Sequence, residues 1–315
     1  MKRFLRNCIV LLLAVAAILW LGGLGYKQTT AYQNLERNEE TEHYRAMPEV
    51  ITFAVFGASH GRDAFQEKDF PNVHFFNFSM SSQTPQYDLM QMRQFQKHIA
   101  AGATVVLTVS YMSPFWTENE ADFGRKQARY YRILSPENIV DCDRGRWVLE
   151  RWSPLLTTGI GSVVEAFAHP QELRADTNTL YGQQTLTQEV IESEQQRVKK
   201  DHLSVVEPAM PAGSSVMLAA LREMAALCRE NGWNAVFVTP PYPDAYTACY
   251  PAEVLERFDA LMTELSAEMR TPWLDYSRSE AFAEAYSYFK NIDHLNLAGA
   301  EAFAKLLRQD LAELA

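Results

Sequence analysis

Two short segments, far apart in the sequence, carry residue types that could perform acyl-transfer chemistry. Ser59 lies in GASHG (57–61), directly after the apolar run ITFAVF (51–56), and His294 ends the segment NIDH (291–294). A serine becomes a nucleophile when a turn exposes its hydroxyl, N–H groups surround it and an imidazole accepts its proton. The two segments together predict Ser59 as nucleophile and His294 as general base. An ordinary strand-to-helix turn with a serine N-cap explains the first segment alone equally well.

Three residues could orient the imidazole of His294. Asn291 could do so through its side-chain carbonyl, although an amide brings no charge to stabilise an imidazolium. Asp293 is charged, but a side chain adjacent to His294 reaches back to the ring less easily. Asp275, at the end of a predicted strand, is a further candidate. We rank a Ser59–His294 dyad assisted by Asn291 or Asp293 above any assignment to Asp275.

The elements that must position these residues alternate between short buried strands and helices. This alternation predicts an α/β fold, a three-layer α/β/α sandwich with a mostly parallel central sheet. Loops at the carboxyl ends of such strands line the ligand crevice. The predicted strands are 51–56, 74–78, 104–110, 235–239 and 273–275, and the predicted helices are 84–101, 215–230, 252–269 and the segment from 297 onward.

The N-terminus predicts a membrane anchor. Lys2, Arg3 and Arg6 precede an uncharged apolar run from Cys8 to Tyr26, which at about 19 residues is long enough to span a bilayer. Basic residues before the run favour an N-terminus on the cytoplasmic side of the membrane and the rest of the chain on the opposite side. We favour an uncleaved anchor over a cleaved signal peptide, because no small-x-small site stands clearly at the end of the run.

The chain is expected to comprise a basic start and transmembrane anchor (1–26), a polar stalk (27–49) and one domain (50–315). That domain carries a mostly helical insertion or lid at about 112–212, where strand signals are weak. Beyond the apolar run three cysteines remain, an odd number without metal-like spacing, which supports neither a disulfide framework nor a metal site, although one bridge between two of them is possible. No cofactor is predicted. The net charge of −10 argues against nucleic acid as a partner. One local basic cluster, explained equally well as a solvated helix face, comprises Arg125, Lys126, Arg129 and Arg132.

Four segments in order resemble one hydrolase superfamily. They are FGASH (56–60), NFSMSSQ (77–83), TPPY (239–242) and DHLNLAG (293–299). The literal G-x-S-x-G match suggests the nucleophile elbow of an α/β-hydrolase, but nothing upstream of this first strand could build an oxyanion hole. An early serine with a histidine before the last helix instead resembles the SGNH (GDSL-like) hydrolases. More narrowly, the segments resemble a membrane-anchored branch similar to the D-alanyl-lipoteichoic-acid biosynthesis protein and to envelope polysaccharide O-acetyltransferases.

The resemblance implies an SGNH/flavodoxin-like fold and an acyl-Ser59 intermediate formed outside the cytoplasm, with His294 as base. The oxyanion would be held by the Ser59 N–H and the segment around Ser79. Asn77, Gln83, Tyr242 and His60 are expected to shape or line the pocket. Two features depart from the family: Asn291 occupies the position where an acid is common, and no asparagine follows the third strand.

The implied activity is that of an esterase or acyltransferase that adds or removes acyl groups on a cell-envelope glycopolymer. A multi-pass membrane O-acyltransferase is the partner that the resemblance suggests. The alternative is a catalytically inactive scaffold or binding protein of an envelope polymer-modification complex.

Overall fold

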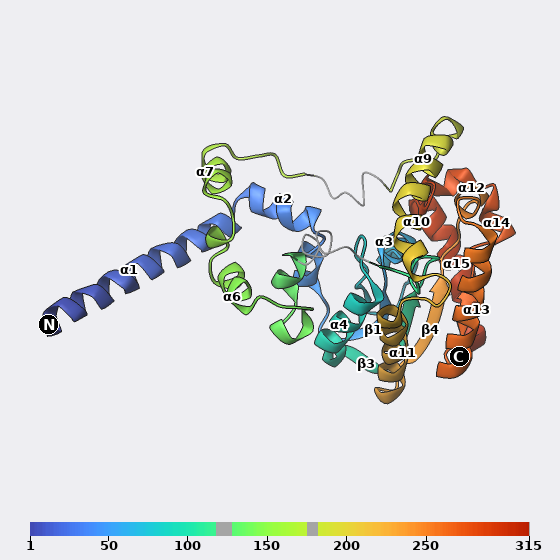
Figure 1. Ribbon diagram of the computed structural model, residues 1–315, viewed down its shortest axis with the longest axis horizontal. Helices are drawn as coiled ribbons and strands as arrows, with labels where there is room; N and C mark the ends of the chain where they lie inside the picture. The colour runs from blue at the N-terminus through green and yellow to red at the C-terminus, as the bar shows by residue number, and fades with distance from the viewer. Residues whose placement is uncertain (118–127, 175–181, 315) are drawn as a thin grey trace. The chain divides into compact units, whose positions relative to one another are not determined.

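The computed structural model describes residues 1–117, 128–174 and 182–314 (Figure 1). The chain divides into two compact units. The first unit comprises Met1–Ala46 and Ala121–Thr177, and the second comprises Met47–Glu120 and Asn178–Ala315. Of the predicted basic cluster, Arg125 and Lys126 lie outside the described residues.

A five-stranded parallel sheet forms the centre of the second unit and confirms the predicted α/β fold class. Its strand order is β2-β1-β3-β4-β5. Both faces of the sheet are covered, which explains why the strands read as nearly continuous apolar runs in the sequence. The strands are β1 (Ile51–Phe56), β2 (Phe75–Asn77), β3 (Ile99–Thr108), β4 (Asn234–Thr239) and β5 (Trp273–Asp275); a separate antiparallel pair is formed by β6 (Phe289–Asn291) and β7 (His294–Leu295).

Helices pack on both faces of this sheet. On one face, Phe303 and Leu307 of α15 (Leu297–Leu314) join Phe53 and Val55 of β1 in one buried cluster. Side chains alternate along a strand, so Phe56 points to the opposite face. The helices α4 (Pro85–Phe95), α11 (Ser215–Glu230) and α13 (Ala252–Met269) pack on one another there. The remaining helices of this unit are α3 (Ser59–Ala64), η2 (Glu67–Asp69), η3 (Gln96–His98), α9 (Gln188–Asp201), α10 (Leu203–Val206), η6 (Glu207–Ala209), α12 (Asp244–Thr247), α14 (Glu280–Ala283) and η7 (Tyr286–Tyr288).

The boundary between the first predicted helix, 84–101, and the third predicted strand is wrong by several residues. The helix ends at Phe95 instead of near residue 101, and β3 begins at Ile99 instead of residue 104. Ile99 pairs with Ile51 of β1, and Gly102 N–H donates a hydrogen bond to Gly232 O. These partners lie far away in the sequence, so the local pattern could not place the start of β3.

The segment predicted as a polar stalk contains helical structure. Helix α2 (Thr30–Asn38) lies in it, capped by the Thr29 hydroxyl, and η1 (Glu42–Ala46) follows. Tyr32 is buried in a small cluster with Tyr26 and Ala166, and its ring meets that of Tyr26 edge-on at 5.4 Å. The stalk segment shows little apolar periodicity because its packing partners come from the insertion.

The predicted insertion is divided between the two units. In the first unit it contributes η4 (Pro136–Asn138), α6 (Arg144–Trp152), η5 (Pro154–Leu156) and α7 (Ile160–Ala168). Its later part, with α9 and α10, belongs to the second unit. This later part supplies charged groups to the candidate site.

The first unit begins with α1 (Lys2–Lys27), which is long and apolar enough to cross a membrane and is almost entirely exposed. Its composition agrees with the predicted anchor, whereas the predicted orientation across the membrane stays a prediction.

Candidate active site

The turn that carries Ser59 lies at the carboxyl end of β1, beside the end of β3. Sheets with this strand order have their topological switch point between these two strands, and ligands bind in the crevice outside it. Gly57 has φ +152°, and a Cβ built there would lie 2.7 Å from Thr108 Cβ. A Cβ on Gly61 would lie 2.7 Å from Ser79 Oγ. Glycine at both positions therefore lets the turn sit directly against β3 and the loop after β2.

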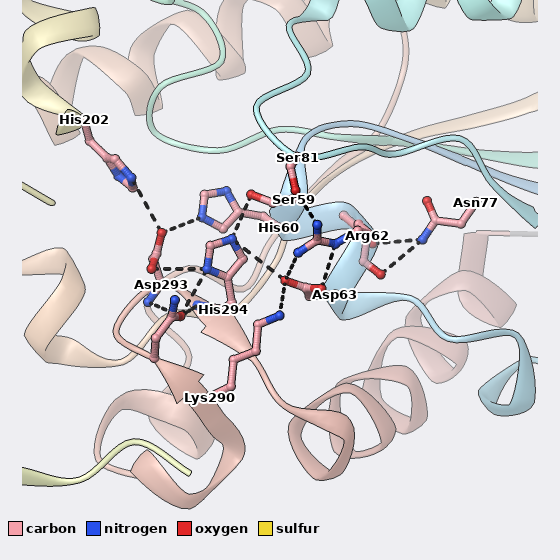
Figure 2. A network of polar contacts seen from close by, with 12 residues as sticks. Ser59, His60, Arg62, Asp63, Asn77, Ser81, His202, Lys290, Asp293 and His294 are labelled. Carbon is pink, nitrogen blue, oxygen red and sulfur yellow. Dashed lines mark hydrogen bonds and ion pairs between the residues drawn. The ribbon is translucent and has the colours of Figure 1, made fainter. Parts of the chain in front are cut away.

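Ser59 is the first residue of α3, and Ala58 occupies the N-cap position. The serine hydroxyl therefore does not cap the helix, contrary to the ordinary interpretation of this turn. Instead, Ser59 Oγ lies 2.8 Å from His294 Nε2 (Figure 2). As the first residue of the helix, Ser59 also has an N–H without an intrahelical acceptor. The structure thus brings the two segments, 235 residues apart, into hydrogen-bond contact.

Oxygen atoms face the other nitrogen of the His294 imidazole. Nδ1 lies 3.1 Å from Asn291 Oδ1 and 3.2 Å from Asp293 Oδ1. The Asn291 oxygen also accepts the N–H of His294 at 2.9 Å, which fixes the amide orientation. Because only acceptors face Nδ1, that nitrogen carries the proton, and Nε2 is left to accept the proton of the Ser59 hydroxyl. Asn291 and Asp293 both orient the ring, whereas Asp275 caps its own turn by accepting Ser277 N–H.

The Asp293 carboxylate is buried, and a cation and three imidazoles surround it. Arg197 Nη2 lies 2.8 Å from Oδ1, while the Nε2 atoms of His202 and His60 lie 3.6 and 3.8 Å from Oδ2. Burial acts to raise the pKa of Asp293, but the imidazoles of His294, His60 and His202 outweigh it and hold this pKa well below its usual range. Asp293 therefore stays ionised, as a residue that orients and stabilises an imidazolium must.

His202 is itself held by buried tyrosines. Its Nδ1 lies 3.2 Å from the Tyr246 hydroxyl and 3.1 Å from the Tyr250 hydroxyl. Burial lowers the pKa of His202 to about 4, so the ring is neutral at pH 7. Sequence reasoning missed Arg197 and His202. Both lie in or directly after α9, whose charged residues look like a solvated helix face, and no local signal distinguishes them.

A second buried carboxylate, Asp63, lies on the serine side of the His294 ring (Figure 2). Its Oδ2 is 3.9 Å from His294 Nε2 and 2.9 Å from Lys290 Nζ, and Arg62 Nε lies 2.9 Å from Oδ1. Burial alone would raise the pKa of Asp63, but Arg62, His294 and Lys290 lower it to about 2. So weak a base does not compete with His294 for the proton of Ser59. Arg62 also contacts the Ser81 hydroxyl.

Two of the predicted pocket residues hold the framework of the site together. Asn77 Nδ2 donates to the carbonyl groups of Gly61 and Phe65, both at 3.1 Å, and so ties α3 to the end of β2. Gln83 is buried, and its Nε2 donates to Gly57 O at 3.2 Å and to Asp88 Oδ1 at 2.6 Å. Their amides are thus engaged with the protein rather than with the crevice.

The other predicted pocket residues lie closer to the Ser59 and His294 side chains. Ser79 N–H is engaged with Asn77 Oδ1 at 3.0 Å, whereas the buried Ser79 hydroxyl has no hydrogen-bond partner among the described residues. His60 stacks on His294 with ring centroids 4.8 Å apart, and Tyr242 meets His60 edge-on at 5.2 Å. His60 and Tyr242 thus form the wall behind the His294 imidazole.

His60, Asp293 and His294 offer one ligand atom each within 4.8 Å of one another, a spacing that suggests a metal site. The ring planes of His60 and His294, however, are nearly parallel, at 24°. Nitrogen lone pairs lie in the ring planes, so stacked imidazoles do not converge well on one ion. Both nitrogens of His294 also face protein partners. The arrangement fits a hydrogen-bonded serine–histidine–acid array better than a metal centre.

No protein-family model and no curated protein matches this chain. Among solved structures, the protein YXIM from Bacillus subtilis is 13% identical with a TM-score of 0.39, and the match covers 85% of this chain and 57% of that one. A GDSL-like lipase from Bacteroides thetaiotaomicron is 11% identical with a TM-score of 0.41, covering 89% and 99% of the two chains. An extracellular lipase from Streptomyces rimosus is 10% identical with a TM-score of 0.37, covering 82% and 98%. Because the sequence identities and TM-scores of these matches are low, the fold is assigned from the observed strand order of the sheet.

Proposed function

We propose that this protein is a membrane-anchored serine esterase or O-acyltransferase of the SGNH type, with Ser59 as nucleophile. The observation that carries the proposal is the 2.8 Å contact between Ser59 Oγ and His294 Nε2, with acceptors on Nδ1. Hydrogen-bond reach between nucleophile and base, with the base oriented by a third group, is the arrangement that activates a serine.

In the proposed reaction, Ser59 Oγ attacks the carbonyl carbon of an ester while its proton passes to His294 Nε2. The Ser59 N–H, and as second donor the Ser79 hydroxyl, would stabilise the oxyanion. Collapse of the tetrahedral intermediate breaks the ester C–O bond, and His294 returns the proton to the leaving alcohol. Water or an acceptor hydroxyl then attacks the acyl-serine, gives its proton to His294 and regenerates Ser59. Water as acceptor gives hydrolysis, and a sugar hydroxyl gives transfer.

The proposed substrate is a cell-envelope glycopolymer that receives or loses O-linked acyl groups outside the cytoplasm. Support for this class comes from the four sequence segments that resemble envelope acyltransferases and from an N-terminal helix apolar enough to cross a membrane. We extend the proposal to a multi-pass membrane O-acyltransferase as the partner that supplies the acyl group.

The chemistry is tested by labelling the full-length protein in detergent with a serine-directed fluorophosphonate. We expect an adduct on Ser59 that is lost in Ser59→Ala and His294→Ala. Matched controls are Ser82→Ala and His74→Ala, which remove an exposed serine and an exposed histidine and should label like the parent. Absence of an adduct on the folded parent, together with absence of p-nitrophenyl acetate hydrolysis, would contradict the proposed nucleophile.

The biological role is tested by measuring ester-linked acyl groups on the cell surface. We expect Ser59→Ala to change the acyl content as much as deletion of the whole protein does. If deletion changes the content and Ser59→Ala does not, the protein acts as a scaffold rather than as an enzyme.

A further inference from the structure

The inserted part of the first unit is packed against the last two turns of α1. Ser153 Oγ donates a hydrogen bond to Leu19 O at 2.7 Å. A Cβ built on Gly22 would lie 2.8 Å from Leu155 Cδ1, and one on Gly23 would lie 2.7 Å from Ser153 Oγ. Glycines at these positions allow η5 to approach the helix backbone closely. The place where the insertion meets α1 is therefore set by specific contacts.

These contacts fix how deep the insertion lies if α1 spans a bilayer. The apolar run of α1 extends from Cys8 to Tyr26. Leu19 lies seven residues before its end, which is roughly 10 Å at about 1.5 Å per residue. A hydrocarbon core is about 30 Å thick, so residues that touch α1 between Leu19 and Tyr26 lie within the outer third of that core.

Helix α7, which follows η5 after three residues, exposes an unusually apolar face. Its buried residue Ala166 packs in the cluster with Tyr26 and Tyr32. On the other side, Ile160, Val164 and Phe167 are 83%, 60% and 52% exposed. The sequence of α7, IGSVVEAFA, contains one charged residue. A soluble surface helix of this length normally presents a polar outer face, whereas here these three large apolar side chains are exposed beside Ser162 and Glu165.

Helix α6, which precedes η5, has the composition of a membrane-surface helix. Its sequence, RGRWVLERW, combines three arginines with two tryptophans and one glutamate. The Arg151 guanidinium lies 4.7 Å from the ring centroid of Trp147, and Trp152 is partly exposed. Arginine and tryptophan are the residues that gather at the level of lipid headgroups.

We propose that η5 and α7 form a second membrane contact, which lies in the outer leaflet beside α1, with α6 at the headgroup level. The partner of this face is the lipid bilayer itself. The inference rests on the membrane anchoring contained in the proposed function, since the depth of α7 is measured along α1. Its consequence is that the first unit is held at the membrane surface by several elements and not by a single flexible stalk.

The test measures lipid contact of α7 in the full-length protein reconstituted into lipid nanodiscs. Cys8, Cys142, Cys228 and Cys249 are replaced by alanine or serine, and one cysteine labelled with an environment-sensitive fluorophore is introduced at Val164. The same label at Leu13, in the middle of α1, is the control for the anchor. A label at Glu264, an exposed residue of α13, is the control for a water-facing helix.

Phospholipids that carry bromine on their acyl chains should quench the label at Val164 by a fraction close to that at Leu13, and iodide in the water should quench it less than at Glu264. If Leu13 is quenched by lipid but Val164 behaves like Glu264, α7 lies in water and the inference is wrong while the anchor stands. If lipid does not quench the label at Leu13 either, α1 does not span the bilayer, and both the anchor and the inference are wrong.

Discussion

At the scale of single residues, two side chains, one an amide and one a carboxylate, orient the imidazole of His294. Asn291 Oδ1 and Asp293 Oδ1 lie at nearly the same distance from Nδ1, at 3.1 and 3.2 Å. Only the carboxylate carries a charge that stabilises an imidazolium in the transition state. The two side chains should therefore contribute unequally to catalysis, although they contribute alike to geometry.

Asp293→Asn should lower kcat/KM for p-nitrophenyl acetate by about 10²- to 10⁴-fold, because an isosteric amide keeps the contact but loses the charge. Asn291→Ala should lower kcat/KM about tenfold, which corresponds to the loss of one hydrogen bond of about 1.4 kcal/mol. Unfolding curves of both variants serve as the control for folding. A larger loss in Asn291→Ala than in Asp293→Asn would show that the amide is the principal orienting group.

In the proposed mechanism, Arg197 acts through Asp293, whose Oδ1 lies 2.8 Å from Arg197 Nη2. Arg197→Met removes a positive charge that partly neutralises this carboxylate, so the carboxylate then favours the protonated imidazole more strongly. We expect the acidic limb of the pH profile of kcat/KM to move to higher pH, by about half a unit to one unit. Arg197→Lys, which keeps the charge, should move it less.

Arg222→Met is the matched control, because Arg222 pairs with Glu268 on exposed surface of α11 and α13. Its profile should coincide with that of the parent. An unchanged acidic limb in Arg197→Met would mean that Arg197 merely packs against the site.

At the scale of elements, the junction of β1 with α3 depends on glycine at position 57. Gly57→Ala introduces a Cβ at a strained φ and against Thr108, and should destabilise the protein by about 3 kcal/mol or more. Gly102→Ala separates the two effects, since Gly102 also has positive φ, at +77°, but an added Cβ there meets nothing within 4 Å. Gly102→Ala should therefore lower the free energy of unfolding by only about 1 to 2 kcal/mol.

Denaturant unfolding of the two variants measures this difference. Gly57→Ala should also weaken fluorophosphonate labelling, because the turn that presents Ser59 must move away from β3. Equal stability of the two variants would mean that the close approach of Gly57 to Thr108 is not needed for folding.

At the scale of the whole molecule, stability should depend on pH through buried neutral histidines. Burial lowers the pKa of His202 to about 4 and also lowers the pKa of His60. In the unfolded chain a histidine pKa is about 6.5, so the unfolded state binds more protons between these values. The free energy of unfolding should therefore fall as the pH decreases from about 6.5 toward about 4. The lowered pKa values of Asp63 and Asp293 add a further loss only below the ordinary aspartate range.

Denaturant unfolding of the full-length protein in detergent at about pH 7.5 and about pH 5 measures this loss. His202→Gln should show a smaller difference between the two conditions, because glutamine does not titrate. His74→Gln, which replaces an exposed histidine, should behave like the parent. An equal pH dependence in His202→Gln would show that other groups cause it.

The sequence by itself determined the elements whose signals are local. Helices α11 and α13 and strand β5 have the predicted bounds. An apolar stripe marks each helix, α11 stops at Asn231-Gly232, and Pro251 and Pro272 adjoin the start of α13 and of β5. The position of Ser59 after β1 and of His294 shortly before α15 also follows from local pattern. The 2.8 Å contact between Ser59 Oγ and His294 Nε2, in contrast, forms only in the folded structure.

Only the tertiary structure decided which groups surround Asp293, how the insertion divides and that the stalk segment folds. Arg197 lies 96 residues from Asp293 in the sequence, and a charged residue on a helix has the same local pattern whether it faces water or a buried carboxylate. Tyr32 likewise finds its partners in Tyr26 and in Ala166 of the insertion. Propensity and periodicity describe neighbours along the chain, whereas these contacts depend on elements that meet only when the chain is folded.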